Sequence, residues 1–167
     1  MREFDVRHFG AIGDGHAQDT HAIQQAVDAC RNAGGGRVVL RGGVFVSGTV
    51  RLGRGVNFHI ESGTTLRASA NIDDFDESAH RALLFAHDAE GVSLTGLGTI
   101  DGQDKQFMAE ELPYIWRPKP ARPRMIVIVG CRQVTIRDLT IRNAPSWTVH
   151  PVGCDDVIIQ GIRILND

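Results

Sequence analysis

A short pattern of residues occurs twice near the C-terminal end of this chain, and it constrains the fold more than any other feature. Residues 131–141 read CRQVTIRDLTI and residues 154–164 read CDDVIIQGIRI, so corresponding positions lie 23 residues apart. A looser copy, GVSLTGLGTI, occupies residues 91–100. Repeats of roughly 20 to 30 residues built from short strands are typical of solenoids, in which each turn buries its neighbours.

Apolar and polar residues alternate within each copy. Valine, isoleucine and leucine alternate with threonine, arginine and serine, so we expect half-buried strands whose apolar side chains point into the coil. Glycine-containing turns separate further predicted strands at residues 37–40, 44–52, 56–61, 65–68, 83–86, 92–94 and 125–129. At about 22 residues a turn, residues 37–167, less an insertion at residues 103–124, are expected to form about five turns of a single-stranded β-helix.

One helix is predicted, at residues 20–33, with Asp19 or Thr20 as its cap. Its apolar positions fall on one face at helical spacing, at Ile23, Ala26, Val27 and Cys30. Three glycines at 34–36 end it. Since the terminal units of a solenoid need a cap, we expect residues 1–36 to close the N-terminal end of the coil.

The rest of the chain shows no second domain, so residues 1–167 are interpreted as a single β-helix domain. Its turns occupy residues 37–167, and an insertion at residues 103–124 interrupts the rhythm. The glycine-rich residues 9–15 lack the Gly-Lys-Ser/Thr ending of a P-loop, so a structural turn is the preferred interpretation.

Charge and composition exclude several classes of partner. The net charge of −2 gives no electrostatic case for nucleic acid, and no apolar stretch approaches the roughly 18 residues of a membrane span. No cofactor or metal is predicted, because the histidines lack ligand spacing. The first residues carry no apolar signal segment and the three cysteines are odd in number, which together predict a cytoplasmic location.

Two of the cysteines occupy equivalent repeat positions. Cys131 and Cys154 would stack on neighbouring turns, about 5 Å apart as adjacent strands are. That spacing permits a disulfide, but a buried ladder of free thiols is the simpler interpretation. Both remain open at this stage.

The N-terminal motifs resemble a known superfamily. The FGAIGDG of residues 9–15, the helix pattern of residues 19–30 and the GGG of residues 34–36 resemble the opening segment of the pectin-degrading β-helix proteins. The resemblance implies a right-handed parallel β-helix with an N-terminal capping α-helix, an all-β fold apart from that helix.

Downstream motifs narrow the resemblance to one family. The GTIDG of residues 98–102, the RPR of residues 122–124 and the NAPSWTVHP of residues 143–151 resemble the polygalacturonases, which are family 28 glycoside hydrolases. The resemblance covers nearly the whole chain. It implies inverting hydrolysis of the α-1,4 links of galacturonan, without a metal, so the implied partner is a galacturonan oligosaccharide or polysaccharide.

The catalytic motifs of that family are absent from this sequence. The family uses an Asn-Thr-Asp motif and an Asp-Asp pair, supported by Gly-His-Gly and Arg-Ile-Lys segments, and the first of these would follow residues 161–167. We therefore assign no catalytic residue. The chain is interpreted as the N-terminal part of a polygalacturonase-like hydrolase, and it is expected to be inactive alone.

Two aspartate pairs are candidates for the acid and base and are set aside. Inverting hydrolysis needs two carboxyl groups about 6.5–9.5 Å apart, with a water between them. Asp155 and Asp156 are predicted to lie in a turn before a strand. Asp73 and Asp74 belong to an acidic loop, for which solvation is the simplest interpretation.

Trp147 and His150 are the predicted substrate-binding residues. Superposing one repeat on the next places Trp147 where the family's first catalytic aspartate lies one turn later, with His150 nearby. An indole plate suits the apolar face of a sugar ring, and a histidine can hydrogen-bond to hydroxyls. The alternative, in which Trp147 caps the core and His150 anchors a turn, is equally open. Arg124 is predicted to support the insertion rather than to bind a carboxylate.

Two other classes of function remain as alternatives. An open last turn would expose backbone groups with Ile162 and Ile164, an edge that invites pairing. The chain would then be a non-catalytic binding or self-assembly module that associates through its open C-terminal end. A lyase or epimerase of the same superfamily is the other alternative, and the segment at residues 147–151 argues against it.

Overall fold

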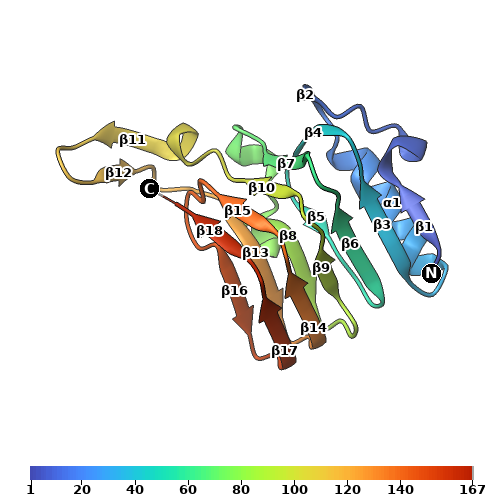
Figure 1. Ribbon diagram of the computed structural model, residues 1–167. Helices are drawn as coiled ribbons and strands as arrows, with labels where there is room; N and C mark the ends of the chain where they lie inside the picture. The colour runs from blue at the N-terminus through green and yellow to red at the C-terminus, as the bar shows by residue number, and fades with distance from the viewer. Residues whose placement is uncertain (167) are drawn as a thin grey trace.

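The computed structural model describes residues 1–166 and is a coil of three parallel sheets (Figure 1). Sheets A and B each hold six strands, in the orders β1-β3-β6-β9-β14-β17 and β18-β15-β10-β7-β4-β2. Sheet C holds four, in the order β16-β13-β8-β5. The chain visits the sheets in the order A, B, C and then begins the next turn, so neighbouring strands of a sheet come from successive turns.

The strand bounds follow this winding. Sheet A contains β1 (Glu3–Asp5), β3 (Gly36–Leu40), β6 (Val56–Ile60), β9 (Ser93–Thr95), β14 (Arg132–Arg137) and β17 (Asp155–Gln160). Sheet B contains β2 (Asp14–Gln18), β4 (Gly43–Ser47), β7 (Thr64–Ala68), β10 (Thr99–Asp101), β15 (Thr140–Arg142) and β18 (Arg163–Leu165). Sheet C contains β5 (Val50–Arg51), β8 (Ala82–His87), β13 (Arg124–Val129) and β16 (Val149–Val152).

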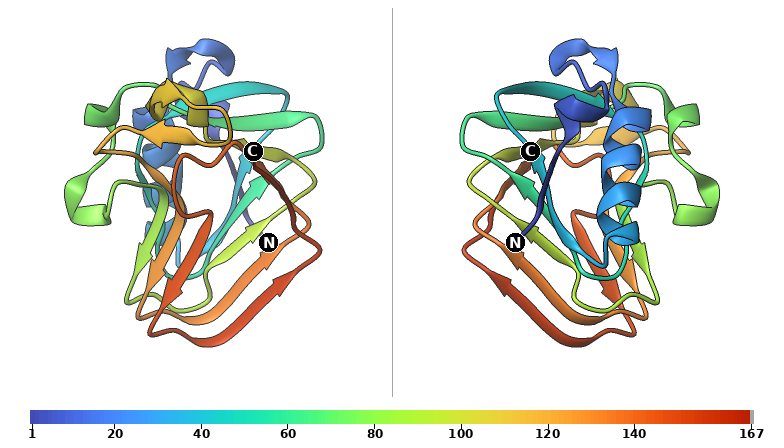
Figure 2. Two further views of the ribbon diagram at one scale, coloured as in Figure 1. Left: turned by 90° about the vertical axis from the view of Figure 1, so that its left-hand side faces the viewer. Right: turned by 90° about the vertical axis from the view of Figure 1, so that its right-hand side faces the viewer.

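The architecture is a right-handed parallel β-helix, which confirms the predicted fold class. Figure 2 shows the coil viewed along its axis, with successive turns stacked behind one another. Helix α1 (Thr20–Asn32) lies at the N-terminal end of the coil. Short 3-10 helices lie outside the coil: η1 (Val6–Phe9), η2 (Ile72–Asp74), η3 (Glu77–Ala79) and η4 (Asp104–Phe107). A two-stranded antiparallel hairpin of β11 (Met108–Glu111) and β12 (Trp116–Pro118) projects from the insertion.

The 23-residue repeat is the register of the last turns. Arg132 pairs with Asp155 in sheet A, and Thr140 pairs with Arg163 in sheet B. Earlier turns differ in length: Arg37 pairs with Asn57, 20 residues further on, whereas Ser93 pairs with Thr135, 42 residues further on, because the hairpin insertion lies between them. The additional residues lie in loops between sheets B and C, so the strands remain stacked although the turns differ in length.

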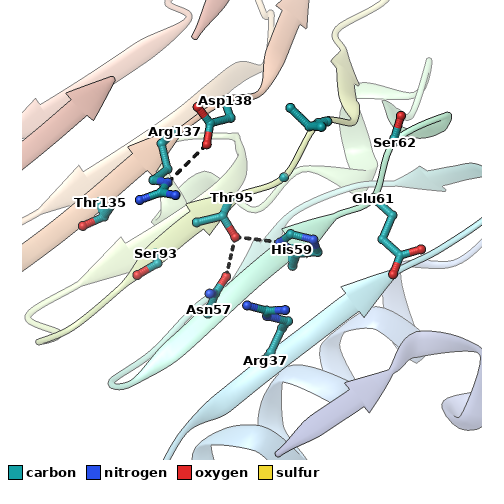
Figure 3. A pocket seen from close by; sticks show the side chains of 12 residues that line it. Arg37, Asn57, His59, Glu61, Ser62, Ser93, Thr95, Thr135, Arg137 and Asp138 are labelled. Atoms are coloured by element: carbon teal, nitrogen blue, oxygen red, sulfur yellow. Dashed lines mark hydrogen bonds and ion pairs between the residues drawn. The ribbon is translucent and has the colours of Figure 1, made fainter. Parts of the chain in front are cut away.

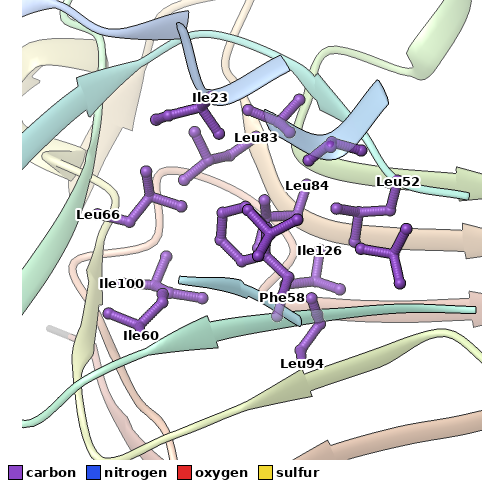
Figure 4. Packing of buried hydrophobic residues seen from close by; sticks show 14 of the residues in the cluster. Ile23, Leu52, Phe58, Ile60, Leu66, Leu83, Leu84, Leu94, Ile100 and Ile126 are labelled. Carbon is purple, nitrogen blue, oxygen red and sulfur yellow. The ribbon is translucent and has the colours of Figure 1, made fainter. Parts of the chain in front are cut away.

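Rows of apolar side chains from successive turns fill the interior of the coil (Figure 4). In sheet A, Phe58 pairs with Leu94 and Leu94 with Ile136, and each is almost completely buried. In sheet B, Leu66 and Ile100 form an equivalent row. Full burial of one such side chain contributes about 1.5–3 kcal/mol, so the stacked rows are the main stabilising feature of the coil.

Helix α1 covers the N-terminal end of this core. Its predicted apolar face is buried, at Ile23, Ala26, Val27 and Cys30. The N-cap Asp19 makes no side-chain hydrogen bond to the helix. Its carboxylate instead accepts hydrogen bonds from the backbone N–H groups of Ile12, at 2.7 Å, and Gly13, at 3.0 Å. The glycine-rich residues 9–15 are therefore a turn closed on the protein's own carboxylate, as the structural interpretation expected.

Two predicted local boundaries are wrong. Residues 44–52 do not form one strand, because the chain turns from β4 to β5 at Gly48, where a Cβ would clash with the backbone carbonyl of Asp74. Asp155 and Asp156 begin β17 rather than preceding it, since Asp155 is already in register with Arg132. In both cases contacts with another turn decide the boundary.

All three cysteines are free thiols, so Cys131 and Cys154 form the unbridged ladder. Burial raises the pKa of the Cys30 and Cys131 thiols, so both are protonated near neutral pH and poor nucleophiles. Among residues 1–166, no helix is long and apolar enough to cross a membrane.

Candidate functional site on the outer face of sheet C

The outer face of sheet C carries a row of side chains that spans four turns. Arg51 of β5 pairs with Phe85 of β8, Phe85 with Val127 of β13, and Val127 with His150 of β16. Outward and inward side chains alternate along each strand, so this row lies on the outer side of the sheet. Phe85 and Val127 in its middle are nevertheless buried, packed with Ala79 and Ala82, and the exposed parts of the row are its two ends. The row leads from the N-terminal turns to His150.

Trp147 and Arg124 adjoin His150 at the C-terminal end of that row. The Trp147 and His150 ring centroids are 4.1 Å apart, at an interplanar angle of 58°. The Cζ atom of Arg124 lies 5.4 Å from the centroid of the Trp147 ring, within the range of a cation–π interaction. The structure thus brings together both predicted substrate-binding residues and adds a guanidinium group.

Trp147 is 56% exposed, so its indole contributes little to the core. The backbone carbonyl of Trp147 accepts a hydrogen bond from the N–H of Met125 at 3.0 Å, which places the residue beside the start of β13. Arg124 stacks on this indole, and its predicted support of the insertion stays a prediction. Arg122 anchors the end of the insertion, because its Nη1 donates to the carbonyl oxygen of Pro145 at 2.8 Å.

His150 is half-buried and uncharged near neutral pH. Burial, together with Arg124 and His80, lowers the pKa of its imidazole. The Nδ1 atom of His150 is buried and has no hydrogen-bond partner in the part of the chain that the structure describes. A neutral imidazole has one donor and one acceptor nitrogen, so this side chain has hydrogen-bonding capacity that the protein leaves unused.

The N-terminal end of the same face holds an ion pair on an aromatic ring. The Cζ atom of Arg51 lies 5.2 Å from the Phe85 centroid, and its Nη2 lies 2.5 Å from Oδ2 of Asp76. Hydrogen bonds from Arg51 and Ser78 lower the pKa of the Asp76 carboxyl to about 2. A general acid needs a raised pKa in order to hold its proton, so Asp76 is unsuited to that role.

A polar cluster that sequence analysis did not identify anchors the segment before Trp147. Asp101 is 6% exposed, and its Oδ2 accepts hydrogen bonds from Nε and Nη2 of Arg142 at 3.2 and 3.0 Å. Its Oδ1 accepts from Nδ2 of Asn143 at 3.0 Å. The signal was available, since Thr-Ile-Asp at 99–101 and Thr-Ile-Arg at 140–142 occupy equivalent strand positions and pair in register.

The aspartate pairs lie elsewhere in the fold. Asp155 and Asp156 belong to β17 in sheet A. Asp74 in η2 accepts hydrogen bonds from Gln18, at 2.6 Å from its Nε2, and from the hydroxyl of Ser69. Within residues 1–166, no group of three or more His, Cys, Asp or Glu side chains is arranged to hold a metal ion.

The coil matches solved structures of known enzymes. The hyperthermoactive exopolygalacturonase from Thermotoga maritima superposes with a TM-score of 0.85 at 23% identity, covering 99% of this chain and 47% of that chain. At that identity the likeness shows the fold alone. It defines the class of protein as a parallel β-helix of the architecture found in that enzyme.

The sequence then identifies the family. The family described as glycosyl hydrolases family 28 matches residues 37–167, and this chain belongs to it. A Vitis vinifera protein named "Probable polygalacturonase" is 31% identical over 180 residues, covering 94% of this chain and 35% of that protein. The chain thus spans about a third of the length of this curated relative. These matches confirm the resemblance to the polygalacturonases.

A shorter match reaches outside the family. A stretch of 47 residues is 55% identical to the mannuronan C5-epimerase AlgE3 of Azotobacter vinelandii, covering 28% of this chain and 3% of that protein. Because the family match extends over residues 37–167, membership of family 28 argues against the lyase or epimerase alternative.

Proposed function

We propose that this chain forms the N-terminal part of a polygalacturonase-like hydrolase and that the outer face of sheet C binds galacturonan. The observation that carries the proposal is the cluster of Trp147, His150 and Arg124 on one face of a family 28 coil. Whole-enzyme activity is part of the proposal, since the chain spans about a third of its curated relative.

Each member of the cluster suits one part of a galacturonate unit. The exposed indole of Trp147 offers an apolar plate for the C–H face of a pyranose ring. The Arg124 guanidinium, stacked on that plate, is placed to meet a uronate carboxylate. The neutral imidazole of His150 can exchange hydrogen bonds with sugar hydroxyls.

We further propose that the chain alone does not cleave the polymer. Inverting hydrolysis requires a protonated carboxyl group and a carboxylate on opposite sides of the scissile bond. On sheet C, the Asp76 carboxylate forms an ion pair with Arg51, and its pKa is lowered to about 2. It is therefore ionised near neutral pH and cannot supply the proton. The motif-bearing residues of the family have no counterpart in this sequence.

The test is a titration of the purified chain with oligogalacturonates, in which binding is measured by tryptophan fluorescence and by calorimetry. The chain has two tryptophans, so Trp116→Ala, in the projecting hairpin, is the matched control for Trp147→Ala. We expect Trp147→Ala to weaken binding by tenfold or more, which corresponds to about 1.4 kcal/mol, while Trp116→Ala binds normally. Equal affinity of the two variants would overturn the binding proposal.

The activity proposal has its own assay. Release of reducing ends from polygalacturonate is expected to stay at the background of a buffer control. Activity that is abolished by substituting one particular aspartate of this chain would contradict it.

The runner-up proposal is self-association through β17 and β18. Large apolar side chains on these strands are about half exposed, at Ile158, Ile159, Ile164 and Leu165. A second copy could pair with this edge through its own β17 and β18. Sedimentation velocity over a wide concentration range would show a shift to dimers, and a concentration-independent monomer would contradict the proposal.

The cytoplasmic location also stays a prediction.

A further inference from the structure

A groove lies on the outer face of sheet A (Figure 3). It has a volume of about 720 Å³, within the usual range for ligand sites. Strands β3, β6, β9 and β14 form it, so it belongs to a different sheet from the Trp147 cluster. Neither the family resemblance nor the proposed function accounts for it.

Small polar side chains form the floor of this groove. Asn57 pairs with Ser93 and His59 pairs with Thr95, so two short rows cross from β6 to β9. Adjacent strands lie about 4.8 Å apart, and the intervening Phe58 and Leu94 point into the core. The floor therefore presents its polar groups at the spacing of the strands.

The hydrogen bonds in the floor determine which groups remain free. Thr95 Oγ1 donates to Asn57 Oδ1 at 2.7 Å and lies 2.8 Å from His59 Nδ1. A threonine hydroxyl has one hydrogen, so His59 Nδ1 is the donor to Thr95. Burial and the nearby Arg37 lower the pKa of His59. The neutral ring therefore leaves Nε2 as a free acceptor, and the Asn57 amide leaves its N–H groups as free donors.

Longer side chains form the two walls. Arg137 on β14 pairs with Asp138, with Nε 3.2 Å from Oδ2, and on the β3 side Glu61 is paired with Arg41 at 3.0 Å. The ion pair between Arg37 and Glu3 is long, with 3.8 Å between Nη1 and Oε1. The buried Nε of Arg37 has no hydrogen-bond partner among the described residues. The walls thus hold opposite charges that largely neutralise one another, with one spare donor at Arg37.

This arrangement selects a ligand chemistry. A sugar hydroxyl is both a donor and an acceptor, which matches a floor that presents free donors and free acceptors together. A polyanion would need an excess of unpaired cations, which the paired walls do not supply. Leu97, 71% exposed at one end of the groove, offers an apolar contact for ring C–H groups.

We propose that the outer face of sheet A is a second carbohydrate-binding surface, specific for a neutral oligosaccharide. It is independent of the galacturonan face on sheet C. In an enzyme with both surfaces, sheet A would hold an uncharged branch or a neighbouring neutral polymer while sheet C binds the galacturonan chain.

The test is a two-dimensional NMR titration of the labelled chain with neutral galacto-oligosaccharides and, separately, with oligogalacturonates, each at low and high salt. We expect the neutral ligand to shift the amide signals of β6 and β9, with an affinity that salt leaves unchanged. The double variant Asn57→Ala/Thr95→Val is expected to weaken this binding by tenfold or more. The matched control is Thr65→Val, on the outer side of β7 in sheet B, which should bind normally.

The outcomes separate this inference from the proposed function. Trp147→Ala should leave binding of the neutral ligand unchanged while weakening that of oligogalacturonate. Failure of the neutral galacto-oligosaccharides to shift the amide signals of β6 and β9 at millimolar concentration would overturn the inference, and so would salt-sensitive binding of oligogalacturonate in this groove. The sheet C proposal is decided separately: it stands where Trp147→Ala weakens oligogalacturonate binding, and it fails where oligogalacturonate does not bind or where Trp147→Ala leaves its affinity unchanged.

Discussion

The outer faces of sheets A and C belong to the same coil but are chemically different. On sheet C, a guanidinium group lies over an aromatic ring at each end of the face, Arg124 over Trp147 and Arg51 over Phe85. On sheet A, Asn57, Ser93 and Thr95 form a low polar floor between paired charges. Because the inward positions are apolar in both, the backbone and core are shared, and the outward positions alone decide what each face can bind.

The largest effects are expected from the shared core. Leu94 lies behind the floor of sheet A and Ile126 behind the row of sheet C, and both are fully buried. Substituting either with alanine should lower the free energy of unfolding by about 2–5 kcal/mol. Urea denaturation measures this, and Ser93→Ala, on the outward side of the same strand as Leu94, should cost less than about 0.5 kcal/mol. If Leu94→Ala cost no more than Ser93→Ala, the common-core view would be wrong.

The next effect concerns the cluster that anchors the Trp147 segment. Asp101→Asn keeps the shape of the side chain but removes the charge that Arg142 contacts with two nitrogens. We expect a loss of about 1–3 kcal/mol in unfolding free energy and weaker oligogalacturonate binding. Binding of the neutral ligand on sheet A should not change, and this difference identifies Asp101 as a positioning residue for one face. An equal loss of binding on both faces would indicate general unfolding instead.

A smaller effect should come from the charge on sheet C. Arg124→Gln removes the guanidinium stacked on Trp147, and we expect oligogalacturonate affinity to fall by about fivefold, or about 1 kcal/mol. The affinity of the native protein should also fall as salt rises, while that of the variant depends less on salt. Arg122→Gln is the matched control, because that side chain binds a backbone carbonyl in the neighbouring segment. Identical salt dependence in native protein and Arg124→Gln would contradict a role in recognising carboxylate.

The smallest effect is a pH dependence that both faces share. Burial lowers the pKa of His59 on sheet A and of His150 on sheet C below the ordinary value of 6.5. The unfolded chain then binds more protons than the folded chain in this range, so the stability contribution is complete above about pH 6.5. It is lost as the pH falls through the folded pKa of each group.

Histidine NMR titration measures both pKa values directly. His59→Gln and His150→Gln should each reduce the loss of stability on acidification from neutral pH. A pKa at or above 6.5 for either group would remove that group from the argument.

The sequence by itself determined the periodic parts of the protein. The 23-residue step between Cys131 and Cys154 became the strand register, and the alternation of apolar and polar residues became the division between core and surface. The buried face of α1 and the family also followed from sequence patterns. These features are local or strictly repeated, so neighbouring residues along the chain carry the necessary information.

Only the tertiary structure decided which side chains meet across turns. The stacking of Arg124 on Trp147, the pairing of Asp101 with Arg142, and the polar floor of Asn57 and Thr95 join residues from different turns. Arg124 and Trp147 lie one 23-residue step apart, but the separation of the other two pairs in sequence depends on the loops between sheets B and C, whose lengths follow no period. The stacking distance between strands is constant while the loop length is not, so side chains that are unrelated in sequence become neighbours on each outer face.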